Sequence, residues 1–105
     1  SSDLGPSAGT AITIAIYSVL NNKPIKNNVA ITGEITLQGD VTAIGGLDLK
    51  ILGGMKANVT TFIFPKENEN NYKKFKEKYD KNGFLDGITF ISVSHIKEVL
   101  KLVFA

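Results

Sequence analysis

The 105-residue sequence contains no cysteine, no arginine and only one histidine. The lack of cysteine excludes disulfides, thiol nucleophiles and thiolate metal ligands, and a single histidine argues against a histidine-built metal site. The lack of arginine excludes bidentate arginine readout of nucleic acid, and the net charge is only +2. The longest apolar run, residues 11–20, is half of the ~20 residues that a membrane-spanning helix needs.

The rest of the composition is that of a folded globular protein. Hydrophobic residues make up 43% and charged residues 21% of the chain, as in globular proteins, and the length is that of one domain or part of one. Hydrophobic patterns predict helices over residues 7–20, 47–57, 67–81 and 95–104 and strands over residues 29–37, 41–44, 60–64 and 88–93. This alternation of helices and strands predicts an α/β fold (α+β, in layers).

Three local predictions concern turns, caps and packing. Residues 38–40 form a turn, so the strands on either side of it pair as a hairpin. Ser94 caps the last helix. Gly53 and Gly54 each weaken their helix by about 1 kcal/mol relative to alanine, which indicates close packing or a bend there.

The motif GPSAG at residues 5–9 makes Ser7 a candidate nucleophile. A Gly-x-Ser-x-Gly motif is typical of the nucleophile elbow of α/β-hydrolases, and the chain order Ser7, Asp86, His95 would permit their triad. However, an elbow serine follows a strand, and only six residues precede Ser7. Pro6 also restricts the required turn, and the chain is too short for that fold. These observations favour a turn position for Asp86 and a surface position for His95.

A lysine can also activate a serine if its amine is neutral near pH 7, which requires burial or nearby positive charge. Most lysines lie in polar segments, whereas Lys50 lies between Leu49 and Ile51 in the first turns of a predicted helix. A helix N-terminus carries about +0.5 charge, which disfavours an ammonium group there. On the residues alone, Lys50 is either a candidate general base or a lysine whose stem crosses an apolar face to reach water.

Five landmarks along the chain together resemble the proteolytic domain of Lon proteases. They are GPSAG, AITGEITLQGDV, IGGLDLK, IFPKEN and VSHIKEVL, which occur in the order of that family and cover nearly the whole chain. Each is weak alone, but their combination is highly specific. The resemblance implies a Lon proteolytic-domain-like fold, a mixed sheet with packed helices, in a single domain at residues 1–105. It also implies that this is the C-terminal portion of such a domain, with the N-terminal part missing.

The resemblance further implies the roles of individual residues. In the family, the serine of the first motif is the nucleophile, and the lysine that ends Gly-Gly-Leu-x-x-Lys is its general base; these positions are Ser7 and Lys50 here. The threonine of the TGE motif, Thr32, would lie beside the lysine and orient it. Two departures from the family pattern occur. Leu4 stands where aspartate is usual, and residues 48–49 replace a more polar pair, which would leave Lys50 in drier surroundings.

As a member of this family, the protein would be the serine endopeptidase domain of an ATP-dependent protease that degrades unfolded or damaged proteins. The domain would need no metal or cofactor, while ATP and magnesium would serve an AAA+ ATPase part of the longer protein. Its partners would be unfolded protein substrates and further copies of the chain in a hexameric ring, without membrane or specific nucleic-acid binding by this domain. The location would be the cytoplasm of a bacterium, or the mitochondrial matrix or another organelle of a eukaryote.

Two alternatives stay open. One is a non-catalytic Lon-like scaffold domain of an ATPase, against which the retention of both Ser7 and Lys50 argues. The other is a truncated fragment that folds but is inactive. A fragment of this kind would expose an apolar surface where upstream strands should pack.

Overall fold

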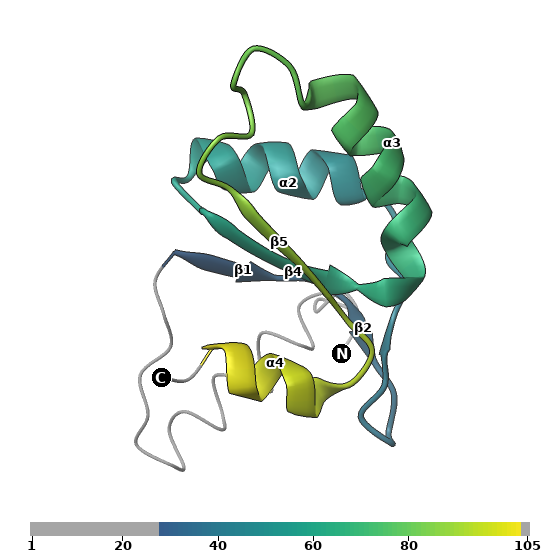
Figure 1. The fold of residues 1–105 in the computed structure, drawn as a ribbon. Coiled ribbons are helices and arrows are strands. Elements are labelled where there is room, and N and C mark those ends of the chain that lie inside the picture. Colours follow the sequence, from purple (N-terminus) through teal and green to yellow (C-terminus); the bar gives the residue numbers. More distant parts are fainter. Residues whose placement is uncertain (1–27, 104–105) are drawn as a thin grey trace.

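The computed structural model describes residues 28–103, so Ser7 and the predicted helix at residues 7–20 lie outside the described part. The strands are β1 (Val29–Ile31), β2 (Glu34–Ile35), β3 (Val41–Thr42), β4 (Thr61–Pro65) and β5 (Thr89–Val93). The helices are α2 (Leu47–Lys56), α3 (Glu69–Tyr79) and α4 (Ile96–Val103), with a short 3-10 helix, η1 (Lys66–Asn68), before α3. Helices packed on a parallel sheet (Figure 1) confirm the α/β class predicted from the sequence.

The central sheet has the strand order β1–β4–β5, and both of its strand pairs are parallel. Val29 is aligned with Thr61, and Thr61 with Thr89. β4 and β5 are rich in β-branched and aromatic residues, which favour strands. The residues of β4 from Phe62 to Pro65 are all buried, because this middle strand is covered on both faces.

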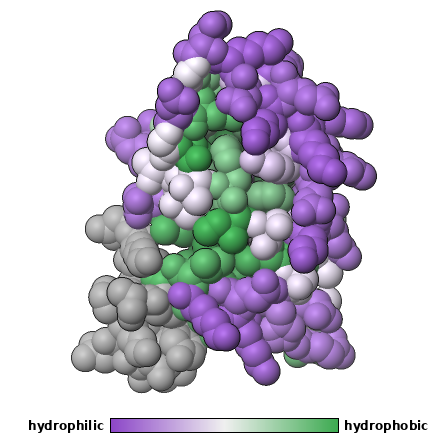
Figure 2. All heavy atoms as spheres, viewed as in Figure 1, coloured by the Kyte–Doolittle hydropathy of each residue, from purple (hydrophilic) through white to green (hydrophobic). Residues whose placement is uncertain are grey.

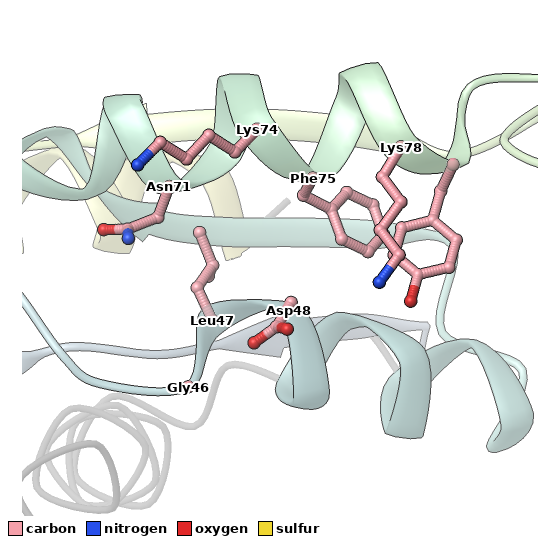
Figure 3. A pocket seen from close by; sticks show the side chains of 8 residues that line it. Gly46, Leu47, Asp48, Asn71, Lys74, Phe75 and Lys78 are labelled. Atoms are coloured by element: carbon pink, nitrogen blue, oxygen red, sulfur yellow. The ribbon is translucent and has the colours of Figure 1, made fainter.

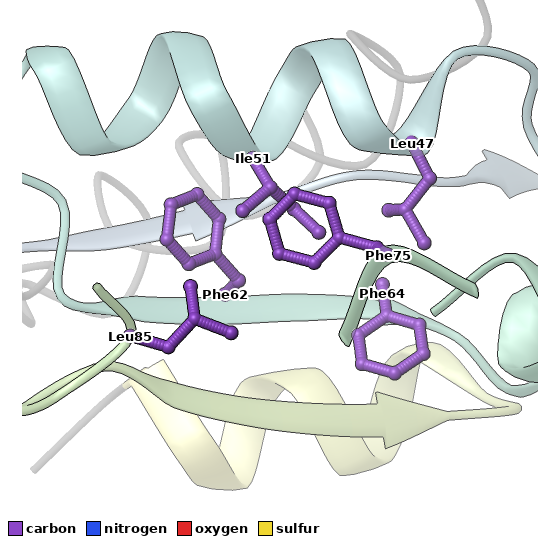
Figure 4. Close-up of a cluster of buried hydrophobic side chains, with 6 residues drawn as sticks. All are labelled: Leu47, Ile51, Phe62, Phe64, Phe75 and Leu85. Atoms are coloured by element: carbon purple, nitrogen blue, oxygen red, sulfur yellow. The ribbon is translucent and has the colours of Figure 1, made fainter. Parts of the chain in front are cut away.

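Helices α2 and α3 cover one face of the sheet, and α4 covers the other (Figure 1). Because successive side chains of a strand point to opposite faces, β4 contributes to two cores. The core on the α4 side consists of Val41, Ile63, Val93, Val99 and Val103. The core on the α2 and α3 side consists of Leu47, Ile51, Phe62, Phe64, Phe75 and Leu85 (Figure 4). Burial of Leu47 and Ile51 in this second core holds α2 against the sheet.

Apolar residues also reach the surface over the sheet. Figure 2 shows a hydrophobic band between the helical layers, with hydrophilic residues around it. Leu37, in the hairpin turn, and Leu49, in α2, are exposed. The expected docking surface for upstream strands stays a prediction, because it depends on residues outside the described part.

The predicted strand at residues 29–37 is two strands in the structure. β1 ends at Ile31 and pairs with β4, whereas β2 begins at Glu34 and pairs antiparallel with β3. Gly33, between them, has a φ of 152°, a value that glycine adopts far more readily than other residues. The hairpin is therefore confirmed for β2 and β3, but the single continuous strand is wrong, because the chain changes sheets at Gly33.

The helix predictions within the described residues are confirmed to within a few positions. The helix predicted from residue 67 starts as η1 and becomes α3 at Glu69. The two glycines of α2 differ: a Cβ atom built on Gly54 would be 2.5 Å from Phe62 Cε1, whereas one on Gly53 would meet nothing within 4 Å. Close packing is therefore confirmed for Gly54 alone.

The start of α4 is stabilised by Glu98 rather than by the predicted Ser94 cap. Glu98 Oε1 accepts hydrogen bonds from the backbone N–H of Ser94 at 2.9 Å and of His95 at 3.0 Å. The Ser94 hydroxyl donates to the same oxygen at 2.9 Å, so it is engaged with this carboxylate instead of accepting from the helix. The backbone N–H of Ser94, followed by its hydroxyl, lowers the pKa of Glu98 below the ordinary value.

Candidate active site

Lys50 lies in the first turn of α2, where its backbone N–H donates to the Gly46 carbonyl oxygen at 3.1 Å. This turn is fixed on its other side by Leu47, whose side chain is buried in the core. The Lys50 side chain is exposed and lines a cavity of about 260 Å³. The fold therefore places the lysine at the N-terminal end of a helix that is anchored in the core, and on the wall of a cavity.

The cavity lies between α2 and the β1 side of the sheet. Its lining consists of Ala30, Ile31, Thr32, Leu47, Leu49, Lys50, Ile51, Gly53, Gly54, Phe62 and Phe64. Of these residues, only Thr32 and Lys50 have polar side chains. The structure thus brings together two of the three residues for which the sequence predicted a catalytic or supporting role, in otherwise apolar surroundings.

Thr32 follows β1 directly and is held by its backbone, because its N–H donates to the Ile63 carbonyl oxygen at 3.0 Å. Its hydroxyl oxygen, Oγ1, is buried and has no hydrogen-bond partner among residues 28–103. A buried hydroxyl without a partner costs about 1–3 kcal/mol. The Thr32 hydroxyl is thus a polar group without a partner on an otherwise apolar cavity wall.

The expected dry surroundings of Lys50 are not observed. Both Lys50 and the neighbouring Leu49 are exposed in the structure, because the buried positions of this helix are Leu47 and Ile51. Ser7 lies outside the described residues, so the distance between the two members of the predicted dyad stays a prediction. The apolar cavity wall formed by Phe62 and other residues was not predicted; the buried pattern of β4 was its only signal in the sequence.

The alternative triad with Asp86 and His95 finds no support in the described residues. Both ring nitrogens of His95 are engaged elsewhere: Nε2 lies 2.9 Å from the Gln38 carbonyl oxygen, and Nδ1 accepts from the Lys97 N–H at 3.1 Å. Because a carbonyl oxygen only accepts, Nε2 carries the proton. Asp86 lies in a turn, as predicted, with its N–H bonded to the Gly83 carbonyl oxygen.

His95 nevertheless has a structural role that the sequence did not predict. It is half-buried and joins the tip of the hairpin to the start of α4. A Cβ atom on Gly39 would be 2.8 Å from the His95 ring, so only glycine allows this approach. His95 thus lies at the surface at the start of α4, as expected, but its contact with the Gln38 carbonyl oxygen, more than fifty residues earlier in the chain, was not predicted.

A second cavity, of about 240 Å³, lies between the N-terminal end of α2 and α3. It is lined by Gly46, Leu47, Asp48, Asn71, Lys74, Phe75, Lys78 and Tyr79 (Figure 3). Lys74, Lys78 and Asp48 bring charges of both signs to its walls. Its lining contains no serine or threonine, and the predicted nucleophile chemistry finds no supporting residue there.

Residues 28–103 offer neither a metal site nor a membrane-spanning helix. They contain no cluster of three or more His, Cys, Asp or Glu residues that could hold a metal ion. Within the same range, no helix has the length and apolar character needed to cross a membrane.

Comparison with known proteins points to one family. Residues 2–105 match the family described as the Lon protease (S16) C-terminal proteolytic domain. The Lon protease of Buchnera aphidicola subsp. Schizaphis graminum is 47% identical over 98 residues, which cover 93% of this chain and 12% of that protein. Lon protease 1 of Bacillus subtilis is 43% identical over 97 residues, covering 92% of this chain and 12% of that protein. The chain thus spans about an eighth of the length of these relatives.

Proposed function

Because the chain belongs to the family of Lon protease (S16) C-terminal proteolytic domains, we propose that it hydrolyses peptide bonds with Ser7 as nucleophile and Lys50 as general base. Family membership makes it a serine protease domain. The roles of Ser7, Lys50 and Thr32 are supported by their motif positions and by the cavity that Thr32 and Lys50 share.

In this mechanism, the neutral Lys50 amine accepts the proton of the Ser7 hydroxyl as Oγ attacks the scissile carbonyl carbon. The C–N bond then breaks, and the lysine returns the proton to the leaving amine, which leaves an ester on Ser7. Water hydrolyses this ester, again with Lys50 as the proton acceptor. Each step needs a lysine that is neutral when the serine is attacked.

The observation that carries the proposal is the buried, unpartnered hydroxyl of Thr32 on a cavity that Lys50 also lines. A threonine hydroxyl oxygen can accept a hydrogen bond from an amine and so hold it in one orientation.

We also propose the wider setting of this chemistry. The domain would act within a longer ATP-dependent protease, whose ATPase part would use ATP and magnesium, and whose copies would assemble into a hexameric ring. Unfolded or damaged proteins would be its substrates. The curated relatives named above are bacterial, and a cytoplasmic location in a bacterium would follow for a protein of that kind.

The test is to replace Lys50 by arginine in the full-length protein that carries this chain. A guanidinium group keeps the charge but cannot accept the serine proton, because its pKa exceeds ~12. Peptide cleavage should fall by about 100-fold or more, the usual contribution of a general base, and Ser7→Ala should abolish it. ATP hydrolysis should continue in both variants. Substantial cleavage by Lys50→Arg would remove the proton-transfer role.

Two controls separate the alternatives. His95→Ala should retain its activity per folded molecule. A strong loss of activity without unfolding would instead favour the triad of Ser7, Asp86 and His95. A serine-reactive probe should label Ser7. No labelling in an assembled, ATP-hydrolysing protein would favour the non-catalytic scaffold.

A further inference from the structure

Asn68 is the one polar residue among the buried residues of the described part of the chain, with 1% of its surface exposed. It ends η1 and directly precedes α3, the position of an N-cap. Asparagine is favoured there because its side chain can accept from the first N–H groups of the helix. Asn68 makes no such bond, so its side chain serves another part of the molecule.

That part is Ile44, in the segment between β3 and α2. Asn68 Oδ1 accepts from the Ile44 N–H at 3.0 Å, and Asn68 Nδ2 donates to the Ile44 carbonyl oxygen at 2.9 Å. The amide therefore pairs with both backbone groups of one residue, as a neighbouring strand would. Nδ2 also donates to Asn71 Oδ1 at 3.0 Å, which fixes the orientation of the amide.

Glu67 extends this clamp to the preceding residue. Its Oε1 accepts from the Ala43 N–H at 2.8 Å. Two adjacent side chains of η1 thus hold two adjacent backbone residues that lie 24 positions earlier in the chain.

The clamped segment leads directly to the lysine. Ile44 is followed by Gly45 and Gly46, and α2 begins at the next residue. Gly46 has a φ of 70°, and its carbonyl oxygen receives the Lys50 N–H. Glycines leave a backbone free to take many conformations. The entry into α2 is therefore set by the Asn68 clamp on one side and by Leu47 burial on the other.

We propose that Asn68, assisted by Glu67, is a positioning residue for Lys50: it fixes the backbone from which the first turn of α2 starts and thereby the place of the lysine amine. This inference rests on the proposed function of Lys50. Asn68 acts through Ile44 and the two glycines. A misplacement of about 1 Å in a catalytic group can cost about 100-fold in rate, so a loosened entry to α2 should be visible in catalysis.

The test is Asn68→Asp in the full-length protein. The change is nearly isosteric and keeps the acceptor for the Ile44 N–H, but it sets a carboxylate oxygen against the oxygens of Ile44 and Asn71. We expect kcat for a short peptide, per mole of folded protein, to fall by about 10-fold or more, with KM within twofold. Asn68→Ser, which adds no charge, should also lower kcat. Asn70→Asp is the matched control, since it makes the same change on the exposed face of α3.

The pH dependence of kcat separates positioning from a merely structural role. If Asn68 only stabilises the fold, its variants lower the folded fraction but leave the profile of the folded enzyme unchanged. If it positions Lys50, the pH profile of the folded Asn68→Ser enzyme should differ from that of the wild type, because the amine that transfers the proton is held in a different place. Wild-type kcat and profile in both folded Asn68 variants would overturn the inference.

Parallel assays of other variants distinguish failure of this inference from failure of the proposed function. Lys50→Arg and Ser7→Ala are assayed in parallel: if they are inactive while the Asn68 variants match wild type, this inference fails and the proposed function stands. If both retain activity, the proposed function itself fails. Should the Asn68 variants not fold, as judged by circular dichroism, Glu67→Ala decides instead. A lowered kcat with normal ATP hydrolysis supports positioning, and an unchanged kcat contradicts it.

Discussion

Replacing Gly54 by alanine should destabilise the protein, although glycine to alanine usually stabilises a helix by about 1 kcal/mol. The new Cβ would lie 2.5 Å from Phe62 Cε1 and 2.9 Å from Cζ, so the ring must move. Phe62 is 3% exposed and stacks on Phe90 with ring centroids 5.7 Å apart. Overpacking of such a core costs about 1–3 kcal/mol, which outweighs the gain and leaves a net loss of up to about 2 kcal/mol.

The assay is urea unfolding of the protein beside Gly53→Ala, a matched control in the same helix. A Cβ at Gly53 meets nothing within 4 Å, so this variant should gain up to about 1 kcal/mol. The two changes should therefore have opposite signs. Phe62→Leu should lower the free energy of unfolding less in the Gly54→Ala variant than in the wild type, because the smaller side chain relieves the clash with the new Cβ. Equal stabilisation by both alanines would refute the packing argument.

Two further predictions concern Thr32 and Glu98. Thr32→Val removes the buried, unpartnered hydroxyl; stability should not fall, while kcat should fall about 2- to 10-fold, the worth of a hydrogen bond between neutral groups, and Thr32→Ser should restore it. An unchanged kcat in Thr32→Val would contradict its role in holding Lys50. For Glu98, the folded pKa lies below the ordinary value of 4.5, so its carboxylate stabilises the fold above that pH, and this contribution is lost as pH falls through the folded pKa. The melting-temperature difference between wild type and Glu98→Gln should be constant at higher pH and shrink below pH 4.5; a difference that widens there would be inconsistent with the lowered pKa.

Local patterns in the sequence were sufficient to predict most helices and strands of the described residues. The segments that became β4 and β5 carry β-branched and aromatic residues between clear breaks, and the apolar stripe of α4 follows the helical period. The split of residues 29–37 could not be predicted in this way. The same β-branched pattern suits one long strand or two short ones, and the choice depends on pairing with β4, some thirty residues later.

The residues of the candidate site also differ in whether the sequence could predict them. Thr32 and Lys50 were predicted from motifs, and the structure brings both to one cavity. Asn68 was missed because the run of polar residues around it has the composition of a solvated helix face. Its burial depends on its two hydrogen bonds to the backbone of Ile44, which have no signature in the sequence. Interactions that join distant backbone and side-chain atoms are those that periodicity does not predict.

The parallel sheet also has a consequence for how the chain folds. Val29 is paired with Thr61, and Thr61 with Thr89, so neither strand pair can form until a long intervening segment has closed into a loop. The β2–β3 hairpin and the helices need only neighbouring residues. Since non-local pairing slows folding, we expect these local elements to appear first and the sheet to assemble late. The slow step would then be the assembly of β1, β4 and β5 into the sheet, and this step would control the folding rate of the residues around Lys50.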